Sequence, residues 1–216
     1  MEDLTEDQQV ERLKAWWAEN GTSIIAGVVL GGAGLFGWNY WQDSQLAAAQ
    51  AASIQFDKAA EAASASDLTL LTQAVNALRQ DHGESPYVIQ GELQLAALHV
   101  QRGETEEAQS VLTDVYAKAK GTPEHAMIGL RLARVQLYRD DADGALATLD
   151  TINDSNYASL VNELRGDVLR SQGLLAQARD AYTQALNEPG DPPVIDATTL
   201  RMKRATLPEA EADETS

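Results

Sequence analysis

The chain has 216 residues, of which 44% are hydrophobic and 23% are charged, which is enough for one sizeable domain. It contains no cysteine, so disulfides and cysteine-ligated metals are excluded. A formal net charge of -17 repels phosphate, so we expect no nucleic-acid partner, although acidity of this kind is also a common solubility adaptation.

An uncharged segment near the N-terminus predicts a membrane-spanning helix. No charged residue occurs between Glu19 and Asp43, and a helix over residues 20–42 is about 34 Å long, against a hydrocarbon core of roughly 30 Å. Its many glycines would weaken a helix in water but are common in lipid, where backbone groups pair internally. We therefore predict an N-terminal segment over residues 1–19 and a transmembrane helix over residues 20–42.

Aromatic residues mark both ends of this segment. All four tryptophans of the chain lie there, and amphipathic rings at both ends are typical of the two membrane–water interfaces. The predicted interface residues are Trp16, Trp17, Trp38, Tyr40 and Trp41.

Two other readings of the segment are a cleaved signal peptide and a buried core helix. A signal peptide has a positively charged start and a shorter apolar core. Here six acids and two bases precede the apolar residues, although Ala49-Gln50-Ala51 resembles a cleavage site. A buried core helix is disfavoured because the segment has no polar face.

The basic residues beside the span predict its orientation. Arg12 and Lys14 precede it, whereas the next base after it is Lys58. Lysine and arginine are enriched on the cytoplasmic side, so we expect a cytoplasmic N-terminus and a large domain on the far side.

Small residues within the span predict a packing face. Gly27 and Gly31 form one small-xxx-small pair, and Ala33 and Gly37 form another. Such pairs allow the backbones of two helices to approach closely, so the face would meet a membrane partner or a second copy.

Helices are also predicted directly after the span. Residues 43–65 contain neither Gly nor Pro, so the membrane helix should continue to about Ala65. Asp67 is placed to cap a second helix that ends near Asp81, and residues 82–86 form a break that ends in Pro86.

An internal repeat follows Pro86. The segments that begin at Leu95, Leu132 and Arg165 are related by shifts of 37 and 33 residues. Each carries a small residue, an alanine 12 positions later, a turn residue between these two, and a large residue in the second helix. The small residues and alanines are Ala96 and Ala108, Ala133 and Ala145, and Gly166 and Ala178; the turn residues are Gly103, Asp140 and Gly173; the large ones are Leu112, Leu149 and Tyr182.

This period is the length of one pair of antiparallel helices, which cross closely where small side chains meet. It resembles the tetratricopeptide repeat, although the usual early Trp and the Tyr of the first helix are missing. We predict an all-α fold: one N-terminal transmembrane helix, then a tetratricopeptide-like α-solenoid over residues 43–206, to which residues 43–81 add a further pair. Its concave face would bind peptides or protein segments.

The C-terminal residues predict a cap and a tail. A short helix over about residues 194–206 should close the array, with Arg201, Lys203 and Arg204 on a solvated face. The acidic residues 207–216 predict a disordered tail.

No catalytic, cofactor-binding or metal-binding constellation is recognisable, so we expect neither an enzyme nor a small-molecule substrate. His82, His99 and His125 lack metal-ligand spacing with one another. The acidic pairs Glu106-Glu107 and Asp140-Asp141 lie at predicted helix starts, where they favour the helix dipole.

Taken over nearly its full length, the chain resembles the YfgM family, the ancillary subunit of the SecYEG translocon in Gram-negative bacteria. The resemblance is carried by residues 16–21 and 37–41 around the span, and by residues 130–136, 145–152 and 164–167 in the repeats. The acidic C-terminal tail departs from the family pattern.

The resemblance implies an inner-membrane protein whose domain lies in the periplasm. It further implies association with the SecYEG translocon and a PpiD-type prolyl isomerase, and a chaperone or adaptor role that passes unfolded secretory proteins to periplasmic chaperones. The alternatives are a membrane-tethered scaffold for another envelope complex and a regulator of an envelope stress response.

Overall fold

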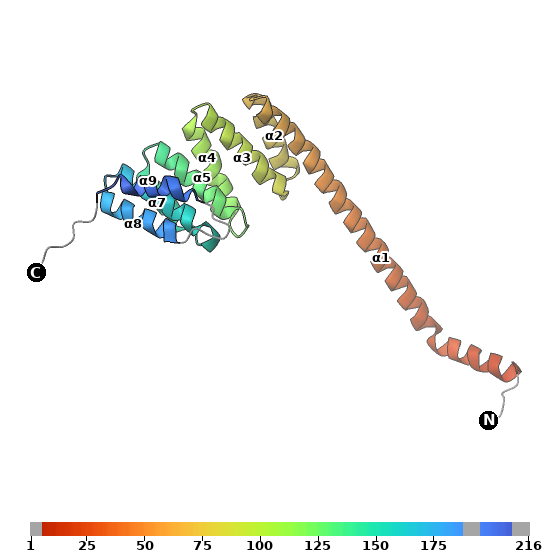
Figure 1. Cartoon of the computed structure of the whole chain (residues 1–216). Coiled ribbons are helices and arrows are strands. Elements are labelled where there is room, and N and C mark those ends of the chain that lie inside the picture. Colours follow the sequence, from red (N-terminus) through yellow and green to blue (C-terminus); the bar gives the residue numbers. More distant parts are fainter. Residues whose placement is uncertain (1–5, 188–194, 209–216) are drawn as a thin grey trace, which may run out of the picture. The chain divides into compact units, whose positions relative to one another are not determined.

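The computed structural model describes residues 6–187 and 195–208, and every regular element in these ranges is a helix (Figure 1). This confirms the predicted all-α fold. The elements are α1 (Glu6–Ser64), α2 (Leu68–Asp81), α3 (Pro86–Gln101), α4 (Thr105–Lys118), α5 (His125–Tyr138), α6 (Ala142–Asp150), the 3-10 helix η1 (Ser155–Tyr157), α7 (Ala158–Ser171), α8 (Leu175–Asn187) and α9 (Ala197–Ala205).

The chain divides into two compact units, Met1–Ala51 and Ala52–Ser216. The first contains most of α1, the one described helix that is long and apolar enough to cross a membrane. Its large apolar side chains are open to the surroundings: Leu30 is 73% exposed and Phe36 is 79% exposed. Such a surface is unfavourable in water and is expected of a helix that meets lipid.

The second unit is built from helix pairs, with α3 packed on α4, α5 on α6, and α7 on α8. The last turns of α1, from Ala52, pack with α2 and α3 in a cluster that includes Ala59, Leu71 and Leu78. A further helix pair therefore precedes the three readable repeats, but it begins at Ala52 and not at residue 43, because residues 43–51 are exposed and belong to the first unit.

Local sequence explains where these helices begin. Asp67 caps α2, because its carboxylate accepts a hydrogen bond from the backbone N–H of Leu70 at 3.0 Å. Ser85 caps α3, with Pro86 in the first helical turn, where a missing N–H costs nothing. The predicted boundaries on both sides of this break are therefore confirmed.

The turns within the three helix pairs share one backbone conformation. Gly103, Asp140 and Gly173 have φ of +77°, +61° and +77°, and they are equivalent under the repeat shifts. A left-handed residue ends the first helix of each pair, as expected after a helix C-terminus.

The array closes with α9, which packs against α8. Asp196 caps α9 by accepting hydrogen bonds from the backbone N–H groups of Thr198 and Thr199, at 2.9 and 3.2 Å. The pKa of Asp196 is lowered by the hydrogen bond from the Thr199 hydroxyl and then by those two backbone bonds. Leu207, which the sequence assigned to the tail, is instead buried against α8, so the ordered array extends past residue 206. Residues 209–216 of the predicted tail lie outside the described residues.

Candidate functional site

The predicted interface tryptophans lie on α1. The Trp38 and Trp41 rings lie 5.2 Å apart between centroids, tilted by 39°. The Trp17 ring lies over Gly21, where an added Cβ would be 3.0 Å from its Cε2 atom, and the Trp16 carbonyl accepts a hydrogen bond from the Asn20 side chain at 2.9 Å. These rings and Tyr40 are exposed, so they are free to face lipid headgroups.

The predicted packing residues of the span lie on an open surface. A Cβ added at Gly27, Gly31 or Gly37 would meet no atom within 4 Å, and Ala33 is exposed. The surface therefore has room for a partner helix.

The six small residues of the repeats lie in the interior and serve packing. Those in the first two pairs share a core cluster within each pair. In the third pair, a Cβ at Gly166 would overlap the Tyr182 ring. The buried residues are Ala96, Ala108, Ala133, Ala145, Gly166 and Ala178.

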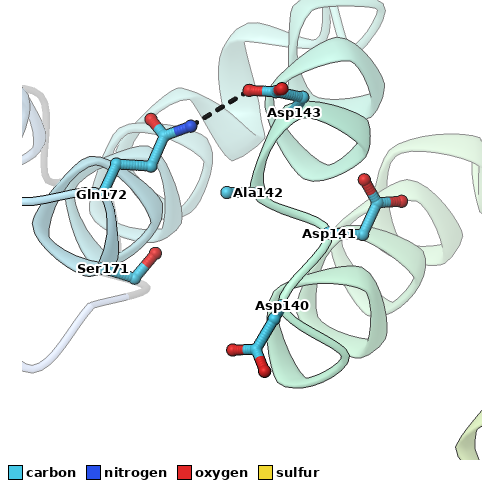
Figure 2. Close-up of a pocket in the computed structure, with 6 residues that line it drawn as sticks. All are labelled: Asp140, Asp141, Ala142, Asp143, Ser171 and Gln172. Atoms are coloured by element: carbon cyan, nitrogen blue, oxygen red, sulfur yellow. Dashed lines mark hydrogen bonds between the residues drawn. The ribbon is translucent and has the colours of Figure 1, made fainter.

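One hollow of about 370 Å³ lies beside the α5–α6 turn and is lined by three aspartates, Ser171 and Gln172. The side chains of Asp140, Asp141 and Asp143 point in different directions, and Asp143 accepts a hydrogen bond from Gln172 at 3.0 Å (Figure 2). Asp141 caps α6 through the backbone N–H of Gly144. Among the described residues, no group of His, Cys, Asp or Glu is arranged to hold a metal ion. The contacts of Asp141 and Asp143 in this hollow are a helix cap and a hydrogen bond between neighbouring helix pairs.

A larger groove of about 700 Å³ lies between α3, α4 and α5. Its buried lining comes from Ala96 on α3, Leu112 on α4 and Val135 on α5. Ala96 belongs to the packed core of the first repeat pair, so the groove lies directly over the crossing of α3 and α4.

Apolar side chains are also accessible in the groove. Val100 is 45% exposed and Tyr138 is 77% exposed, and Ala97 is exposed as well. The side-chain oxygen of Gln94 is buried in the lining and has no hydrogen-bond partner among the described residues. An apolar surface with a few polar groups is typical of a ligand site.

The charges in the groove are opposite to those of the chain. Arg131 and Arg134 are its only charged lining residues, in a chain of 33 acidic and 16 basic residues. They lie three positions apart on one face of α5, and both are exposed. Neither is hydrogen-bonded or ion-paired to another side chain in the described part of the protein, so both guanidinium groups are available.

The repeat shift relates the groove positions of α3 and α5. Gln94 corresponds to Arg131, and Ala97 to Arg134, under the shift of 37 residues. Under the next shift of 33 residues, Arg134 corresponds to Asp167 on α7. Equivalent positions in the first helix of each pair therefore lie on the same side of the array.

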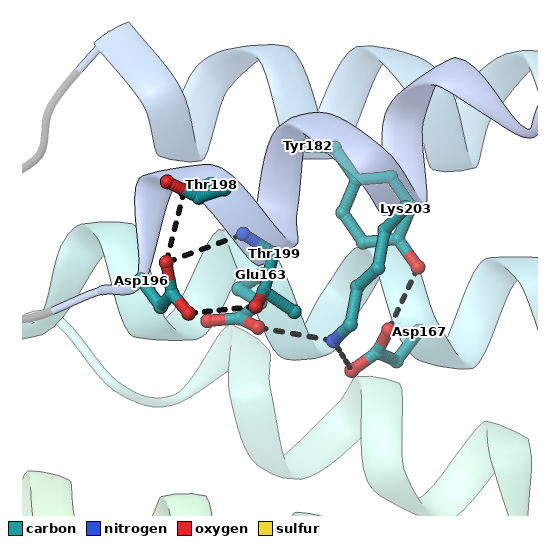
Figure 3. A network of polar contacts seen from close by, with 7 residues as sticks. All are labelled: Glu163, Asp167, Tyr182, Asp196, Thr198, Thr199 and Lys203. Atoms are coloured by element: carbon teal, nitrogen blue, oxygen red, sulfur yellow. Dashed lines mark hydrogen bonds and ion pairs between the residues drawn. The ribbon is translucent and has the colours of Figure 1, made fainter.

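In the third pair this register is already occupied. Lys203 of α9 donates hydrogen bonds to Asp167 at 2.9 Å and to Glu163 at 3.0 Å, and Tyr182 donates to Asp167 at 2.7 Å (Figure 3). The prediction that Lys203 lies on a solvated face is therefore wrong: two carboxylates on α7 hold it. Arg201 and Arg204, by contrast, have no ion pair in the described structure.

These contacts shift two pKa values. Burial raises the pKa of the Tyr182 hydroxyl, and its hydrogen bond to Asp167 raises it further. Burial alone would lower the pKa of Lys203, but its hydrogen bonds to Asp167 and Glu163 outweigh burial, so the pKa is raised. Both shifts favour the protonated forms, in which Lys203 holds α9 on α7 and Tyr182 holds α8 on α7.

A buried carboxylate connects the helices beside the groove. Glu92 on α3 is fully buried, and its Oε1 atom accepts hydrogen bonds from Arg79 on α2 at 2.6 Å and Lys118 on α4 at 2.7 Å. Sequence patterns missed both this cluster and the groove. The arginine pair at i and i+3 in an acidic chain is the signal that could have located the groove.

Comparison with known proteins identifies the family. Residues 14–209 match a tetratricopeptide repeat-like domain family. A protein of Escherichia coli (strain K12) named ancillary SecYEG translocon subunit is 33% identical over 202 residues, which cover 94% of this chain and 97% of that protein. A Haemophilus influenzae protein of the same name is 27% identical, covering 84% of this chain and 89% of that protein.

A solved structure supports the fold alone. The TPR-like repeats of a putative kinesin light chain from Podosopora anserina superpose with a TM-score of 0.54, at 16% identity, over 71% of this chain and 83% of theirs. The family-model match over residues 14–209 and the 33% identity to the Escherichia coli relative show that the chain belongs to the YfgM family of ancillary SecYEG translocon subunits, which carry a tetratricopeptide repeat-like domain.

Proposed function

We propose that this protein is a non-catalytic adaptor of the inner membrane that receives segments of newly translocated proteins in the groove between α3, α4 and α5 and passes them to periplasmic chaperones. The groove is the observation that carries the proposal. An apolar hollow of about 700 Å³ with exposed Val100 and Tyr138 suits side chains that a folded protein would have buried.

The anchor supplies the second part of the proposal. Residues 20–42 of α1 would cross the inner membrane with the N-terminus in the cytoplasm and the repeats in the periplasm. Tethering beside a channel raises the effective concentration of the groove for chains that emerge there. The names of the relatives point to SecYEG as that channel.

Two further partners belong to the proposal. A PpiD-type prolyl isomerase would bind the anchored protein at the translocon, and unfolded secretory proteins would be its clients. A fixed scaffold would hold one stable set of partners instead, and a stress regulator would act through residues 1–19, so capture of clients separates these readings.

Photo-crosslinking from the groove tests the proposal. A photoreactive amino acid at Val100 of the full-length protein, in membrane vesicles that import a secretory precursor, should capture the precursor during transport. Ala97→Trp should remove this capture by filling the groove from an exposed position. Ala176→Trp is the matched control, since Ala176 is exposed on α8 away from the groove. Capture of SecYEG subunits without any precursor would contradict the client role.

A further inference from the structure

The groove carries a charge preference that the proposed function does not require. Its two arginines lie beside accessible apolar surface, and no acidic residue lines it. The chain as a whole carries a net charge of -17, so the two unpaired arginines form a local positive site that attracts a carboxylate at short range.

The accessible polar groups of the groove match a carboxylate. The Arg131 and Arg134 guanidinium groups are exposed and donate hydrogen bonds to oxygen. The two arginines lie on one face of α5, and Val100 of α3 lines the same groove. A segment between the two helices can therefore place an apolar side chain on Val100 and Tyr138 and a carboxylate on the arginines.

The third helix pair contains an internal counterpart with reversed charges. Asp167 occupies the register of Arg134, and there Lys203 of α9 binds it at 2.9 Å. At this repeat position, a charged side chain of the first helix is thus paired with an opposite charge on a segment packed over it, here α9. In the second pair the charge is positive, so the matching group is an acid.

We infer that the groove selects extended polypeptide segments in which an apolar residue is accompanied by aspartate or glutamate, with Arg131 and Arg134 as the residues that read the carboxylate. The inference rests on the proposed function, because it names which segments the groove would accept. It makes Arg131 and Arg134 specificity residues, while Val100 and Tyr138 supply binding that does not depend on charge.

Peptide binding to the full-length protein in lipid nanodiscs tests this. The probes are three fluorescent peptides that share one alternating apolar sequence and carry Asp, Asn or Lys at the same two positions. The Asp peptide should bind about threefold to tenfold more tightly than the Asn peptide, with the Lys peptide weakest, and higher salt should narrow the difference.

Arginine variants separate selection from general attraction. Arg131→Gln with Arg134→Gln should equalise the Asp and Asn peptides, and Arg131→Glu with Arg134→Glu should favour the Lys peptide. Arg201→Gln with Arg204→Gln is the matched control, because it removes one exposed and one half-buried cation at the same spacing from α9, neither of which has an ion pair in the described structure. If the Asp preference survives the groove variants, or falls equally in the control, the inference is wrong.

A variant of the exposed apolar residues distinguishes failure of the charge preference from failure of the proposed function. Val100→Ala with Tyr138→Ala should weaken all three peptides, and both side chains are exposed enough to be removed without disturbing the core. If this variant weakens the binding of all three peptides, but the unchanged protein binds them equally, the charge preference is wrong and the groove remains the client site. No binding by any peptide, or binding that ignores this variant, overturns the groove as the client site as well.

Discussion

Gly166 on α7 lies directly against the ring of Tyr182 on α8, so closely that a Cβ at Gly166 would overlap ring atoms. The same positions in the two preceding pairs hold Ala96 with Leu112 and Ala133 with Leu149, each separated by 16 residues. The smaller residue on one helix thus compensates for the larger one on its partner.

This relationship predicts that Gly166→Ala destabilises the domain by about 1–3 kcal/mol through overpacking. Adding Tyr182→Leu should recover part of the loss, because it recreates the Ala–Leu pairing of the other repeats. Full recovery is not expected, since the hydrogen bond from Tyr182 to Asp167 disappears. Denaturant unfolding of the unchanged protein, the two single variants and the double variant measures the coupling in a double-mutant cycle; additive effects would contradict direct contact.

The buried Glu92 cluster predicts that removing its two cations costs more unfolding free energy than removing the carboxylate. Replacing Arg79 and Lys118 together by Ala leaves the fully buried Glu92 carboxylate without a cation and should cost about 3–5 kcal/mol. Glu92→Met leaves two cations whose side chains are 33% and 48% exposed and can be hydrated, so it should cost less. Chemical unfolding compares the two, and an equal or larger loss for Glu92→Met would refute this account.

The contacts that Lys203 of α9 and Tyr182 of α8 make with Asp167 of α7 predict a loss of stability at alkaline pH. The folded pKa values of Lys203 and Tyr182 are both raised, so the folded state keeps protons that the unfolded state releases near pH 10. Their contribution is complete below that pH and is lost as pH rises through the folded values. Tyr182→Phe should therefore reduce the alkaline fall in unfolding free energy, whereas Tyr138→Phe, on an exposed side chain, should leave it unchanged.

The small residues Gly27 and Gly31 predict that a large side chain on their face of the span weakens packing with a partner helix. Gly31→Leu should weaken recovery of the translocon or of a second copy with the full-length protein, because it fills the open surface beside Gly27. Gly32→Leu adds the same side chain about 100° away around the helix and is the control. Co-purification from mild detergent measures both, and equal effects would indicate altered insertion rather than packing.

The absence of cysteine makes the orientation directly measurable. Glu84→Cys, in the exposed α2–α3 loop, should react with an impermeant maleimide in spheroplasts. Asp7→Cys should react only after the membrane is opened. The reverse pattern would place the repeats in the cytoplasm and remove the proposed role.

Periodicity and spacing were sufficient to predict the helices. Regular spacing of Ala, Gly and turn residues dictated three helix pairs, because crossing helices need small side chains and each pair needs a left-handed turn residue. The capping role of Asp67 was equally local, since a cap depends on residues within one turn.

The site depended on contacts between distant residues. Lys203 was expected on a solvated face, yet it pairs with Asp167, 36 positions away, because α9 folds back over α7. The repeat-equivalent position on α5 is Arg134, which no such segment covers in the described part of the chain. The sequence by itself determined an uncharged helix with aromatic ends and a helical array of known period. Only the tertiary structure decided which surface remained uncovered, since the groove arises where α3, α4 and α5 meet. Its positive charge arises because Arg131 and Arg134 have no acidic partner there among the residues that the structure describes, and such pairing depends on contacts between residues far apart in the sequence.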